Sequence, residues 1–107
     1  MRLVIIESPY SGDVRRNKAY LQACILDCLR RGESPYASHQ MLTEALNDCV
    51  ASERKMGIEA GFFWRYKAAA TVVYDDLSVS RGMRAGIEHA HQIGCPVEWR
   101  KLGGKWS

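Results

Sequence analysis

Two unbroken runs of apolar residues constrain the fold of this chain more than any other feature of its sequence. The segments RLVIIE (residues 2–7) and AATVVYDD (residues 69–76) lack the alternation that is typical of a strand with one solvent-exposed face. Strands of this kind are buried on both faces, as in a parallel sheet covered by helices. Both runs therefore predict inner strands of such a sheet.

Helical periodicity occupies the intervals between the predicted strands. Residues 14–31 repeat apolar side chains at helical spacing, between Asp13 as a predicted N-cap and Gly32 as a stop. Residues 52–66 and 80–93 predict two more helices, and residues 34–39 and 95–100 two more strands. The resulting order predicts an α/β fold, a three-layer Rossmann-like or flavodoxin-like open parallel sheet of about four strands with helices on both faces.

Composition bounds the class of protein. A length of 107 residues predicts a single domain over residues 1–107, with residues from about 101 onward forming a loose tail. A formal charge of +3, with basic and acidic residues interspersed, argues against binding to duplex nucleic acid. We expect no membrane span, no secretory signal, no metal site and no cofactor, and the four cysteines are interpreted as reduced thiols of a cytoplasmic protein.

Polar residues gather in the loops that follow the first three predicted strands. Ligands of open parallel sheets bind beyond the carboxyl ends of the strands, and helix N-termini there favour anions. The predicted ligand-binding residues are Ser8, Pro9, Tyr10, Asp13, Asn17, His39, Asp75, Ser80, Arg81, Gly82 and Met83. The alternative role is simple helix capping for Ser80 and Asp13, loop capping for His39, and solvent exposure for Arg81.

Several short motifs together resemble the nucleoside 2-deoxyribosyltransferase-like family, in a compact branch found mostly in phage and bacterial genomes. They are ESPYSGD after the first strand, an Asn-bearing helix (VRRNKAYLQAC), and SRGMRAGIEHAHQIGCPVEW at the end. The resemblance covers residues 2–100 approximately and implies a cleft for a nucleoside or nucleotide. It also implies that the loop tyrosine, Tyr10, orients the catalytic acid, and that the Ser80 turn holds a 5′-phosphate in monophosphate-cleaving members.

The expected catalytic acid is missing from its place in this pattern. In the resembled family a nucleophilic glutamate lies four residues after the glycine of the Ser-x-Gly turn, and here that position is Gly86. Glu88 is rotated by roughly 200° from it around the helix and is predicted to face solvent, as are His89 and His91. Asp75 and Glu7, at strand ends, are alternative acids, although binding of ribose hydroxyls is favoured over catalysis for both.

Three functions remain open at this point. The first is binding of a nucleotide-like ligand without cleavage, as in a phage protein that sequesters a nucleotide signal of bacterial immunity. The second is an N-glycosidase or deoxyribosyltransferase that uses a displaced acid, namely Asp75, Glu7 or Glu88. The third is an interaction module with a filled cleft. The crowded aromatic residues of FFWRY (residues 62–66) predict a homo-oligomer that buries part of this helix.

Overall fold

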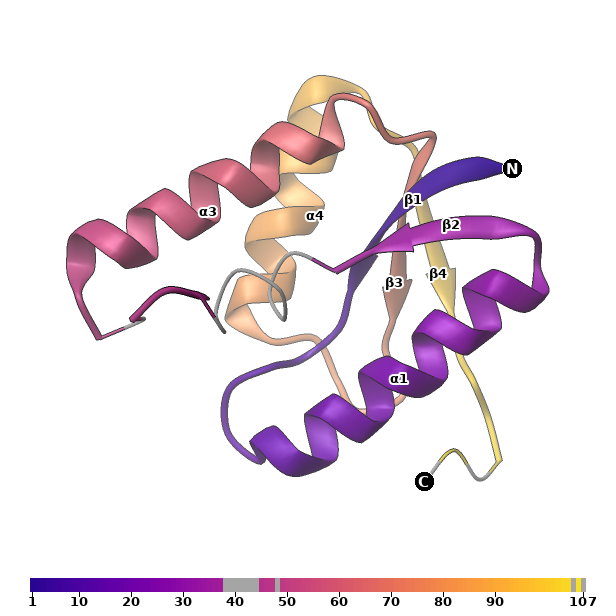
Figure 1. Ribbon diagram of the computed structural model, residues 1–107. Coiled ribbons are helices and arrows are strands. Elements are labelled where there is room, and N and C mark those ends of the chain that lie inside the picture. Colours follow the sequence, from indigo (N-terminus) through magenta and orange to yellow (C-terminus); the bar gives the residue numbers. More distant parts are fainter. Residues whose placement is uncertain (38–44, 48, 105, 107) are drawn as a thin grey trace.

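A computed structural model describes residues 1–37, 45–47, 49–104 and 106 of the chain. Its centre is a four-stranded parallel sheet in the order β2-β1-β3-β4 (Figure 1). The strands are β1 (Arg2–Glu7), β2 (Glu33–Tyr36), β3 (Ala70–Tyr74) and β4 (Val97–Arg100). This arrangement confirms the predicted α/β fold, and the two apolar runs form the two inner strands.

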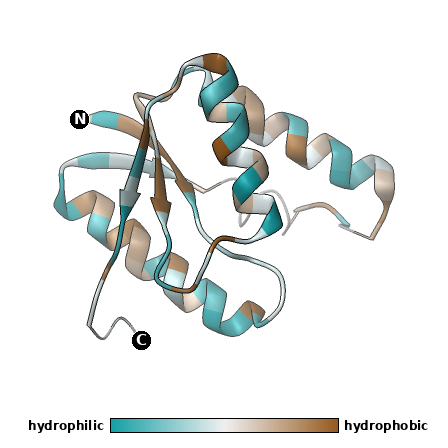
Figure 2. Ribbon diagram, turned by 180° about the vertical axis from the view of Figure 1, so that it is seen from behind, coloured by the Kyte–Doolittle hydropathy of each residue, from teal (hydrophilic) through white to brown (hydrophobic). Residues whose placement is uncertain are grey.

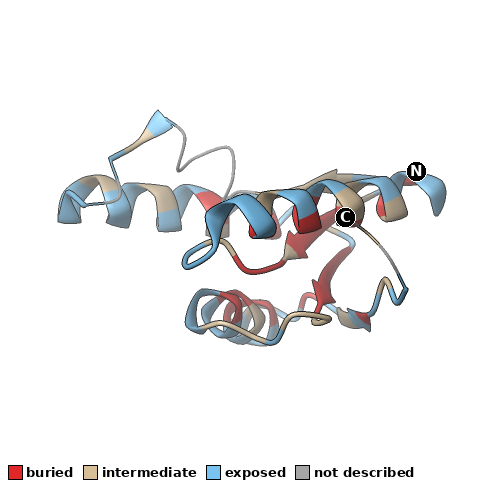
Figure 3. Ribbon diagram, turned by 90° about the horizontal axis from the view of Figure 1, so that it is seen from below, coloured by how far each residue is buried: buried red, intermediate tan, exposed pale blue. Residues whose placement is uncertain are grey.

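Helices cover the two faces of the sheet. The helices α1 (Val14–Arg30) and α4 (Arg81–Ile93) lie on opposite sides of it, as the view from below shows (Figure 3). The helix α3 (Ala51–Arg65) contacts α4 near its C-terminal end, while its N-terminal half extends away from the sheet (Figure 1). None of the helices in the described ranges is long and apolar enough to cross a bilayer.

The core is built on the two inner strands. All five residues of β3 are buried, and Val4, Ile5 and Ile6 of β1 are at most 1% exposed. These strands carry the hydrophobic stretches of the sheet in Figure 2. On the α1 side the predicted apolar stripe packs against them through Leu21, Cys24 and Cys28, whereas Leu29 at its end is 50% exposed. Neither inner strand has a solvent-exposed face, which explains why apolar and polar residues do not alternate in the two runs.

The segment after β4 departs from the expected loose tail. The backbone N–H groups of Leu102 and Gly103 donate to the Asp76 carboxylate over 2.9 and 3.1 Å. Trp106 packs edge-on against Tyr20, with ring centroids 5.0 Å apart. The Tyr20 hydroxyl donates to the same carboxylate. The described tail residues are therefore bound to the domain, because a half-buried carboxylate at the end of β3 collects their donors.

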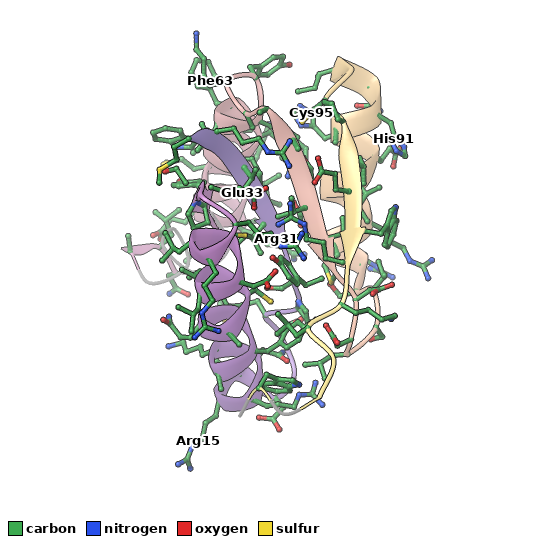
Figure 4. The ribbon with its side chains drawn as sticks, turned by 90° about the vertical axis from the view of Figure 1, so that its right-hand side faces the viewer. Arg15, Arg31, Glu33, Phe63, His91 and Cys95 are labelled. Atoms are coloured by element: carbon green, nitrogen blue, oxygen red, sulfur yellow. The ribbon has the colours of Figure 1, made fainter. Side chains whose placement is uncertain are left out.

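The aromatic cluster of α3 is distributed between the domain and solvent. Phe62 is partly buried, whereas Phe63 is 71% and Tyr66 is 63% exposed. Phe63 lies at the periphery of the molecule in Figure 4, at the end opposite Arg15. Met56 and Ile58, earlier on the same helix, are also exposed. That part of this helix covers a second subunit stays a prediction.

Candidate functional site

A cavity of about 260 Å³ lies at the carboxyl end of β1, between the following loop, α3 and the start of α4. Three segments form its walls. Its lining consists of Glu7, Ser8, Tyr10 and Ser11 from β1 and its loop, Leu46, Glu53, Arg54, Gly57, Ile58, Phe62 and Arg65 before and along α3, and Ser80, Gly82, Met83, Ala85 and Gly86 from α4. The cavity thus lies where parallel strands were predicted to gather ligand-binding loops.

The loop after β1 is held in place by the first turns of α1. Buried Asn17 donates from its side-chain amide to the carbonyl oxygens of Tyr10 and Ser11, both over 2.9 Å. Asp13 caps the helix as predicted and accepts from the Arg16 N–H group. Neither Asn17 nor Asp13 lines the cavity. Asn17 instead fixes the backbone from which Tyr10 reaches it.

The start of α4 forms the facing wall. Ser80 is the N-cap and its hydroxyl accepts from the Met83 N–H group over 3.2 Å, while the Met83 sulfur accepts from the Ser80 N–H group. The N–H group of Met83 therefore has a partner in the Ser80 side chain. The N-terminal end of the helix dipole gives this wall a positive partial charge. Ser80, Gly82 and Met83 line the cavity, whereas Arg81 is exposed and lies outside the lining.

Glu7 brings a carboxyl group to the floor of this cavity, against the backbone of α4. A Cβ atom added at buried Gly86 would lie within 3.0 Å of the carboxyl carbon and both oxygens of Glu7. Side-chain contacts that short are essentially never found. The missing side chain at residue 86 therefore makes room for the carboxyl group of Glu7.

Arg65, at the end of α3, holds this carboxyl group. Its guanidinium forms an ion pair with Oε2 of Glu7 and donates to the Thr71 hydroxyl over 3.1 Å. It also lies 3.3 Å from Nδ1 of His89. With a side chain only 2% exposed, Arg65 is fixed by partners on β1, β3 and α4 at once. Within the described ranges, the carboxyl group accepts this hydrogen bond from Arg65 at Oε2, and Oε1 is its second acceptor atom.

His89 corrects the expectation of a surface histidine. It is 9% exposed, stacks on Phe62 with ring centroids 4.1 Å apart, and contacts Tyr66 edge-on. Burial and the neighbouring Arg65 lower the pKa of His89. Nδ1 of neutral His89 accepts a hydrogen bond from Arg65, which places the ring proton on Nε2. The buried residues of α4 are Met83, Gly86, His89 and Ala90, which places His89 on the inward face of this helix.

The electrostatics of the floor are set by burial. Burial raises the pKa of the Glu7 carboxyl to about 7, although the Arg65 charge and hydrogen bond act to lower it. A carboxyl group with this pKa takes up or releases a proton near neutrality, so it can accept hydrogen bonds as an anion or donate one as an acid. Glu53 and Arg54 on α3 are the other charged side chains of the lining.

The remaining predicted acids are engaged elsewhere. Asp75 accepts from the Lys101 ammonium group over 2.9 Å and does not line the cavity. Glu88 is exposed, as predicted, and is likewise outside the lining. Among the other predicted ligand-binding residues, Pro9 is buried and does not line the cavity, and His39 lies outside the described residues. Of the three acids considered for catalysis, Glu7 alone lies at the cavity.

Comparison with known proteins identifies the family of this chain and a solved structure with a similar fold. The model of a family described as a domain of unknown function (DUF7768) matches residues 2–100. The chain belongs to this family. No curated protein matches it in sequence. A solved structure of a 2-deoxyribosyltransferase from the psychrotolerant bacterium Bacillus psychrosaccharolyticus is similar at a TM-score of 0.68 and 12% identity, over 96% of this chain and 74% of that chain. The resemblance inferred from sequence is thus confirmed at the level of the fold.

Most of the lining side chains that the sequence analysis missed lie on α3: Glu53, Arg54, Ile58, Phe62 and Arg65. This segment was interpreted only as a helix with an aromatic surface. A weak signal was present in the pair Gly57 and Gly61, whose spacing within a helix is typical of close packing against a neighbouring element. Gly57 lines the cavity and Gly61 is buried.

Proposed function

We propose that this chain binds a nucleoside or nucleotide-like molecule in the cavity between β1, α3 and α4. The observation that carries the proposal is the Glu7 carboxyl group, which lines the cavity; among the described residues Arg65 pairs with its Oε2, and Oε1 is a second acceptor. A sugar hydroxyl is a natural donor to such an oxygen. At about 260 Å³ the cavity is near the lower end of the roughly 300–1,000 Å³ usual for small-molecule sites, which favours a single nucleoside unit.

The other walls complement the rest of such a ligand. Ile58, Phe62 and Met83 offer apolar surface for a base. Ser80 and Gly82 stand at the N-terminal end of α4, where a phosphate or hydroxyl is favoured by the helix dipole. The guanidinium of Arg54 lies on the opposite wall and would attract an anionic group. The shared fold of the 2-deoxyribosyltransferase supports the same ligand class.

Isothermal titration calorimetry with deoxynucleosides, their 5′-monophosphates and ADP-ribose tests this proposal. We expect at least one of them to bind, and Glu7→Gln to weaken its binding by at least tenfold, as is usual when a hydrogen bond to a charged group is lost. Glu88→Gln is the matched control, because the exposed Glu88 lies outside the cavity lining. Absence of heat across the whole panel, or equal weakening by both substitutions, would refute the proposal.

Cleavage of the N-glycosidic bond is the second candidate, favoured by the position of Glu7 at the cavity floor. In this reaction Oε1 would form a bond to the anomeric carbon as the carbon–nitrogen bond breaks. The electron pair goes to the base, which takes a proton from solvent, and water then releases the sugar from Glu7. Arg65 opposes this reaction, because its ion pair with Oε2 makes the carboxylate a weaker nucleophile. Binding is therefore the function we place first.

Chromatography of reaction mixtures separates the two candidates. Incubation with deoxynucleosides and their monophosphates is expected to leave more than nine tenths of the substrate intact after a day. Release of free base that persists through purification and disappears in Glu7→Gln would establish the cleaving function instead. Base release that survives in Glu7→Gln would point to a contaminating enzyme, and the Glu88→Gln variant serves again as the control.

A further inference from the structure

Gly86 lies in the middle of α4. It lies one turn beyond Gly82, is buried, and faces the cavity. Glycine in the middle of a helix is unfavourable relative to alanine, so its presence calls for a steric reason. That reason is the carboxyl group of Glu7, all three terminal atoms of which lie within the space of a Cβ at residue 86.

The contrast with Gly82 on the same helix isolates the effect. A Cβ added at Gly82 would meet only the Ser80 hydroxyl, at 4.0 Å, which is ordinary contact. Both glycines line the cavity, yet only Gly86 is needed to admit another group. A side chain growing from residue 86 would therefore enter the same part of the cavity floor that Glu7 now fills.

The contacts of the carboxyl group oppose its moving aside. The Arg65 guanidinium holds Oε2, and Arg65 is itself held by Thr71 and His89. The side chain of Glu7 is 13% exposed, so displacing it would also break a largely buried ion pair.

We propose that Glu7 and Gly86 form one functional unit, in which the strand supplies the ligand-facing acid of the cavity and the helix supplies the space for it. What matters for binding is that a carboxyl group lies at the cavity floor, whether β1 or α4 carries it. A glutamate at residue 86 is accordingly able to replace Glu7 once Glu7 is removed. The ligand-facing part of this inference rests on the proposed function, whereas the steric part does not.

Thermal unfolding of a set of variants tests the steric part. Gly86→Ala is expected to lower the melting temperature by roughly 5–15 °C in the native background, as overpacking does in a small domain. In the Glu7→Ala background the same substitution is expected to leave the melting temperature unchanged or to raise it. Gly82→Ala, the matched control, should have the same effect in both backgrounds. Equal effects of Gly86→Ala in the two backgrounds would overturn the inference.

Calorimetry with deoxyadenosine and its 5′-monophosphate tests the ligand-facing part. Glu7→Ala is expected to weaken binding by at least tenfold, and Glu7→Ala with Gly86→Glu to recover most of that loss. A second double variant, Glu7→Ala with Gly82→Glu, places the acid on the same helix at the wrong site and should recover none. If the native chain binds neither probe, the proposed function fails for them while the unfolding experiment still decides the steric part. Binding by the native chain without recovery in the Gly86→Glu variant would overturn the functional unit.

Discussion

Replacing Arg65 by leucine is expected to lower the free energy of unfolding by about 3–5 kcal/mol near pH 8. The substitution removes the partner of the Glu7 carboxylate and leaves that charge largely buried. It also removes the donors to Thr71 and His89 and the guanidinium over the Phe62 ring. Leucine fills part of the volume but offers no donor, so the desolvated carboxylate has no compensation.

The pH dependence of this loss has a definite sign. Burial already raises the pKa of Glu7 to about 7, and removing the Arg65 charge removes an influence that lowers it. A carboxyl group with a higher pKa in the folded state than in the unfolded state binds more protons when folded, so stability falls as pH rises. The deficit of Arg65→Leu should therefore be smaller at pH 5, where Glu7 is neutral, than at pH 8. His89, Glu53 and Arg54 also face this region, and comparison with Glu7→Gln separates the contribution of Glu7 from theirs.

Urea unfolding followed by tryptophan fluorescence at the two pH values measures both effects. Arg31→Leu is the matched control, because Arg31 also pairs with an acid, Asp27 over 3.0 Å, but with a side chain 48% exposed. Such surface pairs contribute about 0–1 kcal/mol. A loss for Arg65→Leu no larger than that for Arg31→Leu would show that the buried pair does not stabilise the fold.

The second large effect is expected at Glu33, at the start of β2. Its carboxylate accepts two hydrogen bonds of 2.7 Å from the Arg100 guanidinium and two, of 2.9 and 3.3 Å, from Arg2. Both Glu33 and Arg100 have side chains 5% exposed. These bonds hold the pKa of Glu33 down to about 2. Glu33→Gln is expected to lower the free energy of unfolding by roughly 3 kcal/mol at pH 7, since it leaves Arg100 buried with a weaker partner.

Acid should reduce the difference between the native chain and this variant. The pKa of Glu33 is lower in the folded state, so the stability it contributes is complete above the ordinary value of about 4.5 and disappears as pH falls toward 2. Urea midpoints at pH 7 and pH 3 measure the change. Glu98→Gln is the matched control: Glu98 binds the same two arginines but is 37% exposed, and its loss is expected to stay below about 1 kcal/mol. Figure 4 labels Glu33 near the middle of the molecule. A constant deficit across pH would contradict this account.

The position of the site followed from the sequence through the geometry of parallel strands. Glu7, Tyr10 and Ser80 are distant in the chain but lie at carboxyl ends or helix starts, and all three line one cavity. The same rule suggested Asp75, which instead pairs with Lys101. Strand order alone places a residue at the correct edge of the sheet, but the neighbouring chain segments decide whether its side chain is free. The bound tail decided this for both Asp75 and Asp76.

The sequence by itself determined the layers of this protein, because hydrophobic burial is local information. An apolar run without alternation is buried on both faces wherever it lies, and a helical stripe packs inward whatever its partner. Only the tertiary structure decided that the carboxyl group of Glu7 fills the space opened by Gly86 and that Arg65, from a third element, holds it. These contacts join Glu7 to Arg65, 58 positions later in the chain, and to Gly86, 79 positions later. No periodic pattern in the sequence predicts them, because they depend on how three elements pack in space.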